Sequence, residues 1–273
     1  MSGLDLDAVQ LDRYSRHIIM EDVGPGGQRA LLDADVLVVG AGGLGAPAIQ
    51  YLAAAGVGTL HVVDDDVVER SNLQRQIIHG EDDVGRPKVE SAREFVADLN
   101  PDVDVHTHET RLTKENADAV IGGRDVVVDC ADNFPTRYLV NDYCTLNEIP
   151  YSHGAIYRFE GQVTTFPGHA ESPCYRCLFP EAPPEGVAPD CATAGVLGVL
   201  PGTIGCIQAT EAMKLAMDVG EVLEGRLLYY DAMDLSFQEV TLAKNPECPV
   251  CGDDPEIDSV ADVTYADACA VRS

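Results

Sequence analysis

The sequence predicts an α/β fold: a doubly wound, mainly parallel, Rossmann-like sheet, extended by antiparallel strands and joined to a four-cysteine zinc site. Near the N-terminus, the β-branched run at residues 36–39 leads directly into a Gly-x-Gly-x-x-Gly motif. A second apolar run ends at Asp64, about twenty residues after the motif, as in a nucleotide-binding strand–helix–strand unit. Two Cys-x-x-Cys pairs in the second half predict the metal site.

The glycines of the motif are predicted to contact a nucleotide. A tight turn that brings the backbone close to phosphate leaves no room for a Cβ, and the N-terminus of the following helix offers free N–H groups. We expect Asp64 to accept hydrogen bonds from the ribose hydroxyls. The predicted loop contacts are Gly40, Gly42, Gly43 and Gly45.

Strand and helix patterns alternate along the first half of the chain, which predicts a parallel sheet covered on both faces. The alternation follows a helical lead-in over residues 1–33. The expected elements are a strand near 35–39, a helix near 43–55, a strand near 59–63, a helix over 87–100, a strand near 103–108, a short helix from 113 and a strand near 125–129.

The second half has a different pattern. Residues 155–166 and 226–242 predict antiparallel hairpins, with a helix near 203–218 between them. Seven prolines in residues 167–201 predict a long functional loop. We therefore expect one body over residues 34–252, with a nucleotide-binding first half and a zinc-stapled second half. An acidic tail that frays is expected over residues 253–273.

Carboxylates greatly outnumber basic side chains: 46 Asp and Glu against 18 Lys and Arg give a net charge of −28. The excess is spread along the whole chain, which indicates a surface adapted to high salt and a halophilic archaeal source. An ordinary acidic mesophilic protein is the alternative. The charge argues against direct nucleic-acid binding, because phosphate recognition needs clustered Lys and Arg.

Neither a basic-then-apolar leader nor an apolar run of about 20 residues is found, so we expect a cytoplasmic protein without a membrane partner. In a reducing compartment, paired cysteines indicate metal binding. Cys174 with Cys177 and Cys248 with Cys251 could close a tetrahedral zinc shell. A redox function for either pair alone is the competing interpretation.

The loop after Asp64 carries fixed donors that suit a triphosphate. Asn72, Arg75 and Lys88 follow the acidic residue, whereas a dehydrogenase needs little more than that residue here. We therefore predict ATP rather than NAD. Asp129 and Asp132 follow another apolar run, at the edge where an α/β sheet binds ligands. Asp132 is the favoured Mg²⁺ ligand, with a helix N-cap as its alternative, and Asp129 could cap a turn.

Together these motifs resemble the ubiquitin-activating superfamily in its MoeB/ThiF branch, over roughly residues 10–252, and the acidic composition is similar to that of haloarchaeal activators of small archaeal modifier proteins. The matching segments are 13–17, 40–45, 71–76, 88, 129–133, 154–155, 160–162, 173–177, 195–198 and 248–251.

The resemblance implies ATP-dependent adenylation of the C-terminal glycine of a β-grasp, ubiquitin-like modifier or sulfur-carrier protein ending in Gly-Gly. It assigns Asp64 to ribose, Arg75 and Lys88 to phosphates, Asp132 to magnesium and the four paired cysteines to zinc. Arg16 is expected to reach the ATP of a partner subunit, which implies a homodimer.

Cys191 is the remaining thiol that the resemblance singles out. In members that conjugate proteins or carry sulfur, a cysteine at this place attacks the acyl-adenylate and forms a thioester. In members that serve molybdopterin synthesis, the corresponding thiol can be dispensable. The expected roles are protein conjugation and sulfur transfer, for tRNA thiolation and molybdopterin synthesis. We expect an external sulfur donor, because no sulfur-transferase domain follows Cys251.

Three other functions are compatible with parts of the sequence. The glycine motif alone would suit an NAD(P)-dependent oxidoreductase. A non-catalytic scaffold stapled by zinc would keep the same fold. A tRNA dehydratase belongs to the same superfamily, but its nucleic-acid substrate conflicts with the charge of −28.

Overall fold

The computed structural model of this chain describes residues 6–169, 171–181 and 195–265. Within them, eight strands form one sheet in the order β3-β2-β1-β4-β5-β6-β7-β8. The strands are β1 (Asp35–Val39), β2 (Thr59–Val63), β3 (Asp104–His108), β4 (Val126–Asp129), β5 (Tyr151–Tyr157), β6 (Glu160–Phe166), β7 (Arg226–Asp231) and β8 (Ser236–Thr241). The predicted fold class is confirmed.

The strand order creates a switch point beside β1. This strand pairs in parallel with β2 on one side and with β4 on the other, and Val39 lies opposite both Val63 and Asp129. The segments that follow these three residues therefore emerge together at one edge of the sheet. In α/β sheets of this kind, a ligand crevice lies outside the strand ends at such a point. From β5 onward the pairing becomes antiparallel.

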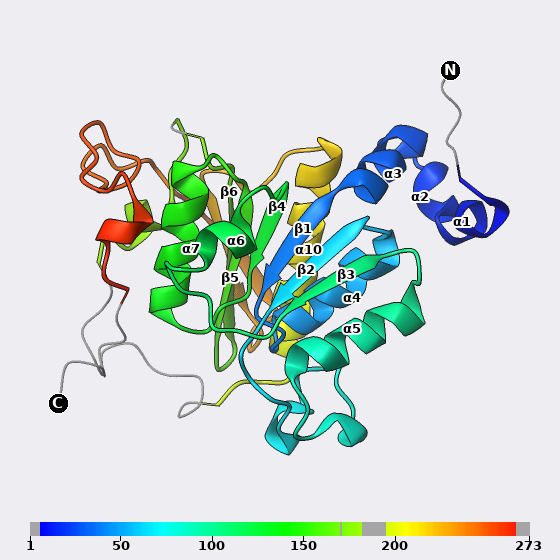
Figure 1. The fold of residues 1–273 in the computed structure, drawn as a ribbon. Coiled ribbons are helices and arrows are strands. Elements are labelled where there is room, and N and C mark those ends of the chain that lie inside the picture. The colour runs from blue at the N-terminus through cyan, green and yellow to red at the C-terminus, as the bar shows by residue number, and fades with distance from the viewer. Residues whose placement is uncertain (1–5, 170, 182–194, 266–273) are drawn as a thin grey trace.

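Helices cover both faces of the sheet (Figure 1). The described helices are α1 (Ala8–Arg13), α2 (Ser15–Ile18), α3 (Gly24–Asp33), α4 (Gly45–Ala55), α5 (Lys88–Leu99), α6 (Ala117–Ile121), α7 (Phe134–Leu146), α8 (Tyr175–Leu178) and α10 (Val199–Met217), with 3-10 turns η1 (Arg70–Asn72), η2 (Glu81–Asp83) and η3 (Val260–Asp262).

Side chains of β1 alternate between two apolar cores. Val36 and Val38 pack with residues of α4, α5 and α10, while Leu37 and Val39 pack with residues of α6 and α7. Both faces of β1 are buried, one in each core. This explains why the strand reads as a continuous apolar run in the sequence. Among the described residues, no helix is long and apolar enough to span a membrane.

The predicted helical lead-in is docked on the body. Tyr14 is buried between α1 and α2, and its hydroxyl accepts a hydrogen bond from Asn100 Nδ2 at 2.9 Å. Gly56, in the left-handed region with φ 80°, leaves the space that the Tyr14 ring fills, because a Cβ there would lie 2.5 Å from the ring. Side-chain packing therefore holds the lead-in against the body of the protein, in addition to the covalent connection of the chain.

Three points of the sequence analysis need correction. Helix α7 was not predicted, and β5 begins at Tyr151, before the expected hairpin. All residues of α7 from Tyr138 to Cys144 are buried. The helix therefore lacks the single apolar stripe by which an amphipathic helix is usually recognised in a sequence. The expected loop over 167–201 also contains α8 and the start of α10.

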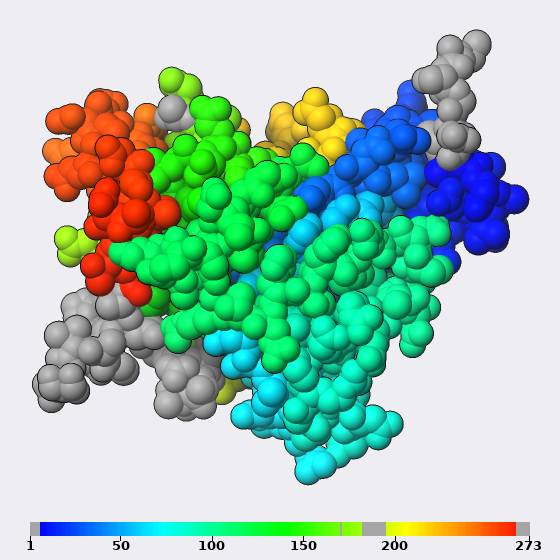
Figure 2. All heavy atoms as spheres, viewed as in Figure 1, coloured from blue at the N-terminus to red at the C-terminus, as the bar shows by residue number. Residues whose placement is uncertain are grey.

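The expectation of a frayed acidic tail is wrong for its described part, residues 253–265. Lys114 Nζ donates to the carbonyl oxygens of Ala261 and Val263 at 2.7 and 3.1 Å. The Tyr265 hydroxyl donates to Asp142 Oδ2 at 2.8 Å. Figure 2 shows this segment, in red, against the green surface near α7. Backbone and side-chain hydrogen bonds thus attach it to the body.

Candidate active site

A cavity of about 740 Å³ opens where β1, β2 and β4 end. Its size is within the range of small-molecule and cofactor sites. Most of the residues predicted to bind the cofactor line it, although they come from four separate segments of the chain. They are Gly40, Gly42, Gly43, Asp64, Asn72, Arg75, Lys88 and Asp132.

The glycine loop is shaped by close backbone contacts. Gly40 has φ 97°, and a Cβ on it would lie 3.1 Å from the Cys130 carbonyl oxygen. A Cβ on Gly45 would lie 1.8 Å from the Gly40 carbonyl oxygen, so the start of α4 can pack on the loop only without a side chain. Gly45 is absent from the cavity lining. The position of Gly45 supports a role in closing the turn between the loop and α4. It does not favour the predicted contact with the cofactor.

Both polar groups of the Ala41 peptide are held from outside the loop. The Ala41 N–H donates to Asp64 Oδ2 at 2.8 Å, and the Ala41 carbonyl oxygen accepts from His79 Nε2 at 3.0 Å. The other ring nitrogen of His79, Nδ1, then accepts from the Ser91 hydroxyl at 2.9 Å. Burial lowers the pKa of His79, which keeps the imidazole neutral in this arrangement. The loop is thus fixed before any ligand arrives.

The Asp64 carboxylate is hydrogen-bonded to the glycine loop but can still accept further hydrogen bonds. Its Oδ1 accepts from the Asp66 N–H at 2.8 Å, in addition to the bond from Ala41. Burial raises the pKa of Asp64, and the charge of Lys88 acts in the opposite direction. Each carboxylate oxygen has a second lone pair, so ribose hydroxyls can be accommodated.

The predicted basic residues are positioned by short local contacts. Lys88, at the first turn of α5, is 7% exposed at its side chain, and its Nζ lies 2.8 Å from Asp66 Oδ2. Arg75 Nη1 donates to the Ser71 carbonyl oxygen at 3.1 Å. Asn72 is buried, and its Oδ1 accepts from the Glu69 N–H at 3.0 Å, so this amide also shapes the η1 turn.

The two carboxylates after β4 have different surroundings. Asn133, not Asp132, caps α7, because its side chain accepts from the Thr136 N–H at 3.0 Å. The N-cap alternative for Asp132 is therefore wrong, and its exposed carboxylate faces the cavity. Asp129 is 1% exposed and accepts from the Ala131 N–H at 3.1 Å, as expected for a residue that caps a turn.

Arg111, Arg137 and Gln76 are among the lining residues that were not predicted. Arg111 and Arg137 add positive charge to the cavity, and Arg137 Nε donates to the Ala131 carbonyl oxygen at 3.0 Å. Gln76 is buried, and its Oε1 has no hydrogen-bond partner within the described part of the chain. Arg137 lies one turn after the capping Asn133 and points back to the strand end. The Asn-x-Pro sequence at the start of α7 could have revealed this helix, and with it the position of Arg137 in its first turns.

The structure does not bring two of the predicted catalytic residues, Arg16 and Cys191, into the described lining of this cavity, for different reasons. Arg16 lies on α2, beside α3 at the upper right of Figure 1, whereas the loop that follows β2 is at the bottom of that view. Arg16 does not line the cavity of its own chain. Cys191 falls outside the described residues, but Gly195 and Val196, shortly after it in sequence, line the cavity.

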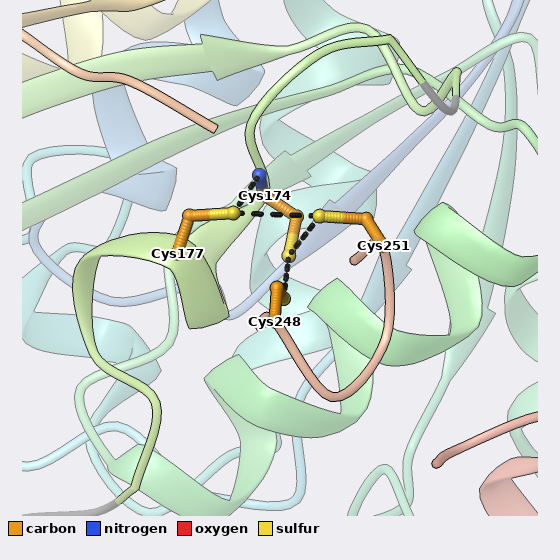
Figure 3. A group of neighbouring side chains, drawn as sticks. All are labelled: Cys174, Cys177, Cys248 and Cys251. Atoms are coloured by element: carbon orange, nitrogen blue, oxygen red, sulfur yellow. Dashed lines mark hydrogen bonds between the residues drawn. The ribbon is translucent and has the colours of Figure 1, made fainter. Parts of the chain in front are cut away.

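The four paired cysteines come together in a second site (Figure 3). The Cys174–Cys248, Cys174–Cys251 and Cys177–Cys251 sulfur atoms lie 3.5, 3.5 and 3.4 Å apart, and all four lie within 4.8 Å of one another. A tetrahedral zinc ion with Zn–S bonds of about 2.3 Å needs sulfur atoms about 3.8 Å apart. The donor set therefore fits zinc, with slight expansion of the cluster.

Backbone and side-chain contacts support the cysteine cluster. The Asn245 N–H points to Cys177 Sγ at 3.3 Å, as is common for metal-bound thiolates. Nearby, Arg176 Nε and Nη2 donate to Asp142 Oδ1 and Oδ2, each at 2.7 Å. This bidentate, buried ion pair attaches α8 to α7. The cluster joins segments seventy residues apart in sequence, as the Cys-x-x-Cys pairs predicted.

Comparisons with known proteins agree with this geometry. The sequence matches the ThiF family over residues 14–250. It is 66% identical to the SAMP-activating enzyme E1 of Haloferax volcanii, over 98% of both chains. It is 51% identical to the sulfur carrier protein adenylyltransferase of Thermus thermophilus, over 96% of this chain and 98% of that one. The crystal structure of Escherichia coli MccB with ATP shares the fold, with a TM-score of 0.78, 21% identity and coverage of 90% and 75% of the two chains.

The fold and these relatives define the class of protein: an adenylyltransferase. The chain belongs to the ThiF family.

Proposed function

We propose that this enzyme uses ATP to adenylate the C-terminal glycine of ubiquitin-like modifier or sulfur-carrier proteins that end in Gly-Gly, with release of pyrophosphate. The observation that carries the proposal is the shared cavity: a glycine loop, the Asp64 carboxylate, the cations Arg75 and Lys88 and the exposed Asp132 carboxylate line one space. The names of the Haloferax and Thermus relatives support a small protein as the substrate. They favour this reaction over nicotinamide-dependent oxidation and over tRNA dehydration.

In the proposed reaction, the glycine carboxylate attacks the α-phosphorus of ATP and the bond to pyrophosphate breaks. A carboxylate is a weak nucleophile, so the cavity must stabilise the charge that develops on the phosphates. Lys88 and Arg75 are suited to this because their positive charges are preorganised. Asp132 would hold Mg²⁺, which when bound neutralises phosphate charge. Asp64 would orient the ribose.

We further propose that Cys191 takes the acyl group from the adenylate. Its thiolate would attack the acyl carbon, AMP would leave and a thioester would form, serving both conjugation and sulfur transfer. The position of Gly195 supports this, because four residues span at most about 14 Å and Gly195 lines the cavity.

The remaining parts of the proposal concern the assembly and its setting. Arg16 lies on α2 and does not line the cavity of its own chain, so it is suited to act in a partner's site, and we propose a homodimer. If so, mixing Arg16→Ala chains with Asp132→Ala chains restores activity in the heterodimers; no recovery in proven heterodimers contradicts it. We also propose that the protein binds a structural zinc ion and receives sulfur from an external donor. Its proposed setting is a cytoplasm of high salt concentration.

The decisive experiment is ATP–pyrophosphate exchange in high salt, with small β-grasp proteins as substrates. We expect exchange with a partner that ends in Gly-Gly and none when its final glycine is deleted, because adenylation needs that carboxylate in place. Competition by NAD for the same cavity is measured in parallel. Equal exchange rates with the intact and truncated partners would refute the proposed reaction.

A further inference from the structure

Tyr175 is a buried residue that adjoins both of the sites described above. It is the residue after Cys174, at the start of α8, and its side chain is 2% exposed. Its ring centroid lies 4.8 Å from that of His153 on β5. The four-cysteine cluster thus places this ring against the strand next to β4, behind the loop that leads to Asp132.

Both backbone polar groups of a single residue in that loop, Ala131, are hydrogen-bonded to side chains. The Ala131 N–H donates to Asp129 Oδ1 at 3.1 Å, and the Ala131 carbonyl oxygen accepts from Arg137 Nε at 3.0 Å. Asp132, the next residue, faces the cavity. The direction of the Asp132 carboxylate therefore depends on how Asp129 and Arg137 are held.

Tyr175 interacts with the groups that hold each of these supports. Asp129 Oδ2 accepts from His153 Nδ1 at 2.7 Å in a pair that is almost fully buried, and His153 packs against the Tyr175 ring. On the other side, burial raises the pKa of the Tyr175 phenol, and the adjacent Arg137 guanidinium lowers it. The Tyr175 hydroxyl and the Arg137 side chain share a hydrogen bond, which places the hydroxyl beside the guanidinium that holds Ala131.

We propose that Tyr175 is a positioning residue, which links the four-cysteine cluster to the Ala131–Asp132 loop and thereby sets the affinity of the site for metal-bound ATP. This inference rests on the proposed role of Asp132. It gives the cysteine cluster a part in shaping the cavity in addition to its part in stability. The physical reason is that a buried carboxylate and a guanidinium keep their directions only when every neighbour is fixed.

A simple packing role for Tyr175 makes a different prediction. The ring also lies 5.4 Å from that of Tyr138 and 5.3 Å from that of Phe179, so it belongs to an aromatic core. Tyr175→Phe keeps this packing and removes only the hydroxyl beside Arg137. Tyr138→Phe is the matched control, since its hydroxyl donates to the Phe179 carbonyl oxygen at 3.0 Å instead.

The test measures binding of Mn²⁺ with ATP, by electron paramagnetic resonance of the metal, to the full-length protein. We expect Tyr175→Phe to weaken this binding about three- to tenfold, the effect of one buried hydrogen bond, while zinc content and melting temperature stay at the values of the control. In the exchange assay, the Mg²⁺ concentration for half-maximal rate should rise by the same factor, with most of the rate recovered at saturating Mg²⁺.

Two results would overturn the inference: wild-type metal dependence in Tyr175→Phe, or an equal shift in Tyr138→Phe. Asp132→Asn separates this failure from failure of the proposed function. If Asp132→Asn weakens metal binding and Tyr175→Phe does not, only the inference is wrong. If Asp132→Asn binds Mn²⁺ and ATP like the wild type, the assigned role of Asp132 is wrong, and the inference is wrong with it.

Discussion

Gly45 and the carbonyl oxygen of Gly40 are so close that a Cβ on Gly45 would lie 1.8 Å from that oxygen. The contact brings the first turn of α4 onto the loop, where the Ala46 N–H donates to the Gly42 carbonyl oxygen at 2.9 Å. We predict that Gly45→Ala destabilises the protein by more than about 2 kcal/mol and abolishes ATP binding, because the loop must move. Denaturant unfolding and nucleotide titration measure the two effects.

Gly26→Ala is the control for this substitution. Gly26 lies in α3, and a Cβ there meets nothing within 4 Å. Alanine should leave ATP binding unchanged and stabilise the helix by up to about 1 kcal/mol. A folded Gly45→Ala protein with wild-type affinity for ATP would show that the close contact is dispensable.

Lys88 is the cation most deeply set in the cavity wall. We predict that Lys88→Met lowers pyrophosphate exchange about 10²- to 10³-fold, the loss expected when one preorganised charge is removed from a developing anion. Stability should change little, since the partner carboxylate of Asp66 is 68% exposed and can be hydrated. Lys114→Met, which alters a lysine bound to Ala261 and Val263, should leave exchange unchanged. Similar rates for both variants would contradict the phosphate role.

The four-cysteine cluster predicts about one zinc per chain, and removal of zinc should unfold the protein. Metal analysis and circular dichroism during chelation test this. Cys248→Ser should lower the zinc content and the melting temperature, whereas Cys206→Ser, on α10 and outside the cluster, should change neither. A folded, active preparation without zinc would refute the assignment.

Folding stability should fall as the pH drops below about 6.5. Burial lowers the pKa of His79, of His153 and of His61, the last to about 4. A histidine with a lowered folded-state pKa binds its proton mainly when unfolded, so its contribution is complete above 6.5 and is lost towards lower pH. Denaturant unfolding between pH 8 and about pH 5.5 measures the slope.

Single variants isolate the contribution of His79 to this slope. They are needed because the pKa of Asp64 is raised in the folded state, so this carboxyl makes the protein more stable as the pH falls, opposite to the histidines. His79→Gln should flatten the dependence, while His169→Gln, at an exposed position, should leave it as in the wild type. An unchanged slope in His79→Gln would mean that its buried imidazole does not govern the acid sensitivity.

Cys191 separates two steps of the proposed reaction. Adenylation needs no thiol, so Cys191→Ser should keep nearly full pyrophosphate exchange. It should fail to form the adduct with the modifier protein that a reducing agent cleaves, which gel electrophoresis and mass spectrometry detect. Cys206→Ser is the control for loss of a thiol. A serine variant that sustains both conjugation and sulfur transfer in cells would show that Cys191 is not the acceptor.

The elements around the glycine loop could be predicted because their signals are local. Strands β1 and β2 and the turn at Gly40 are encoded by consecutive apolar residues and glycine spacing. The cysteine pairs were equally clear, since each lies within one short turn. Helix α7 gave no such signal, because its surroundings bury it on several sides and remove the polar face that marks an amphipathic helix.

By itself, the sequence determined the fold class, the nucleotide cavity's main residues and the pairing of four cysteines into one cluster. The tertiary structure alone decided which carboxylate after β4 faces the cavity, because Asn133 takes the N-cap and Asp129 turns inward to His153. It also brought Arg137 to the Ala131 carbonyl and Tyr175 behind the same loop. These relationships join residues far apart in the chain, and packing between strands and helices fixes them without leaving a periodic pattern in the sequence.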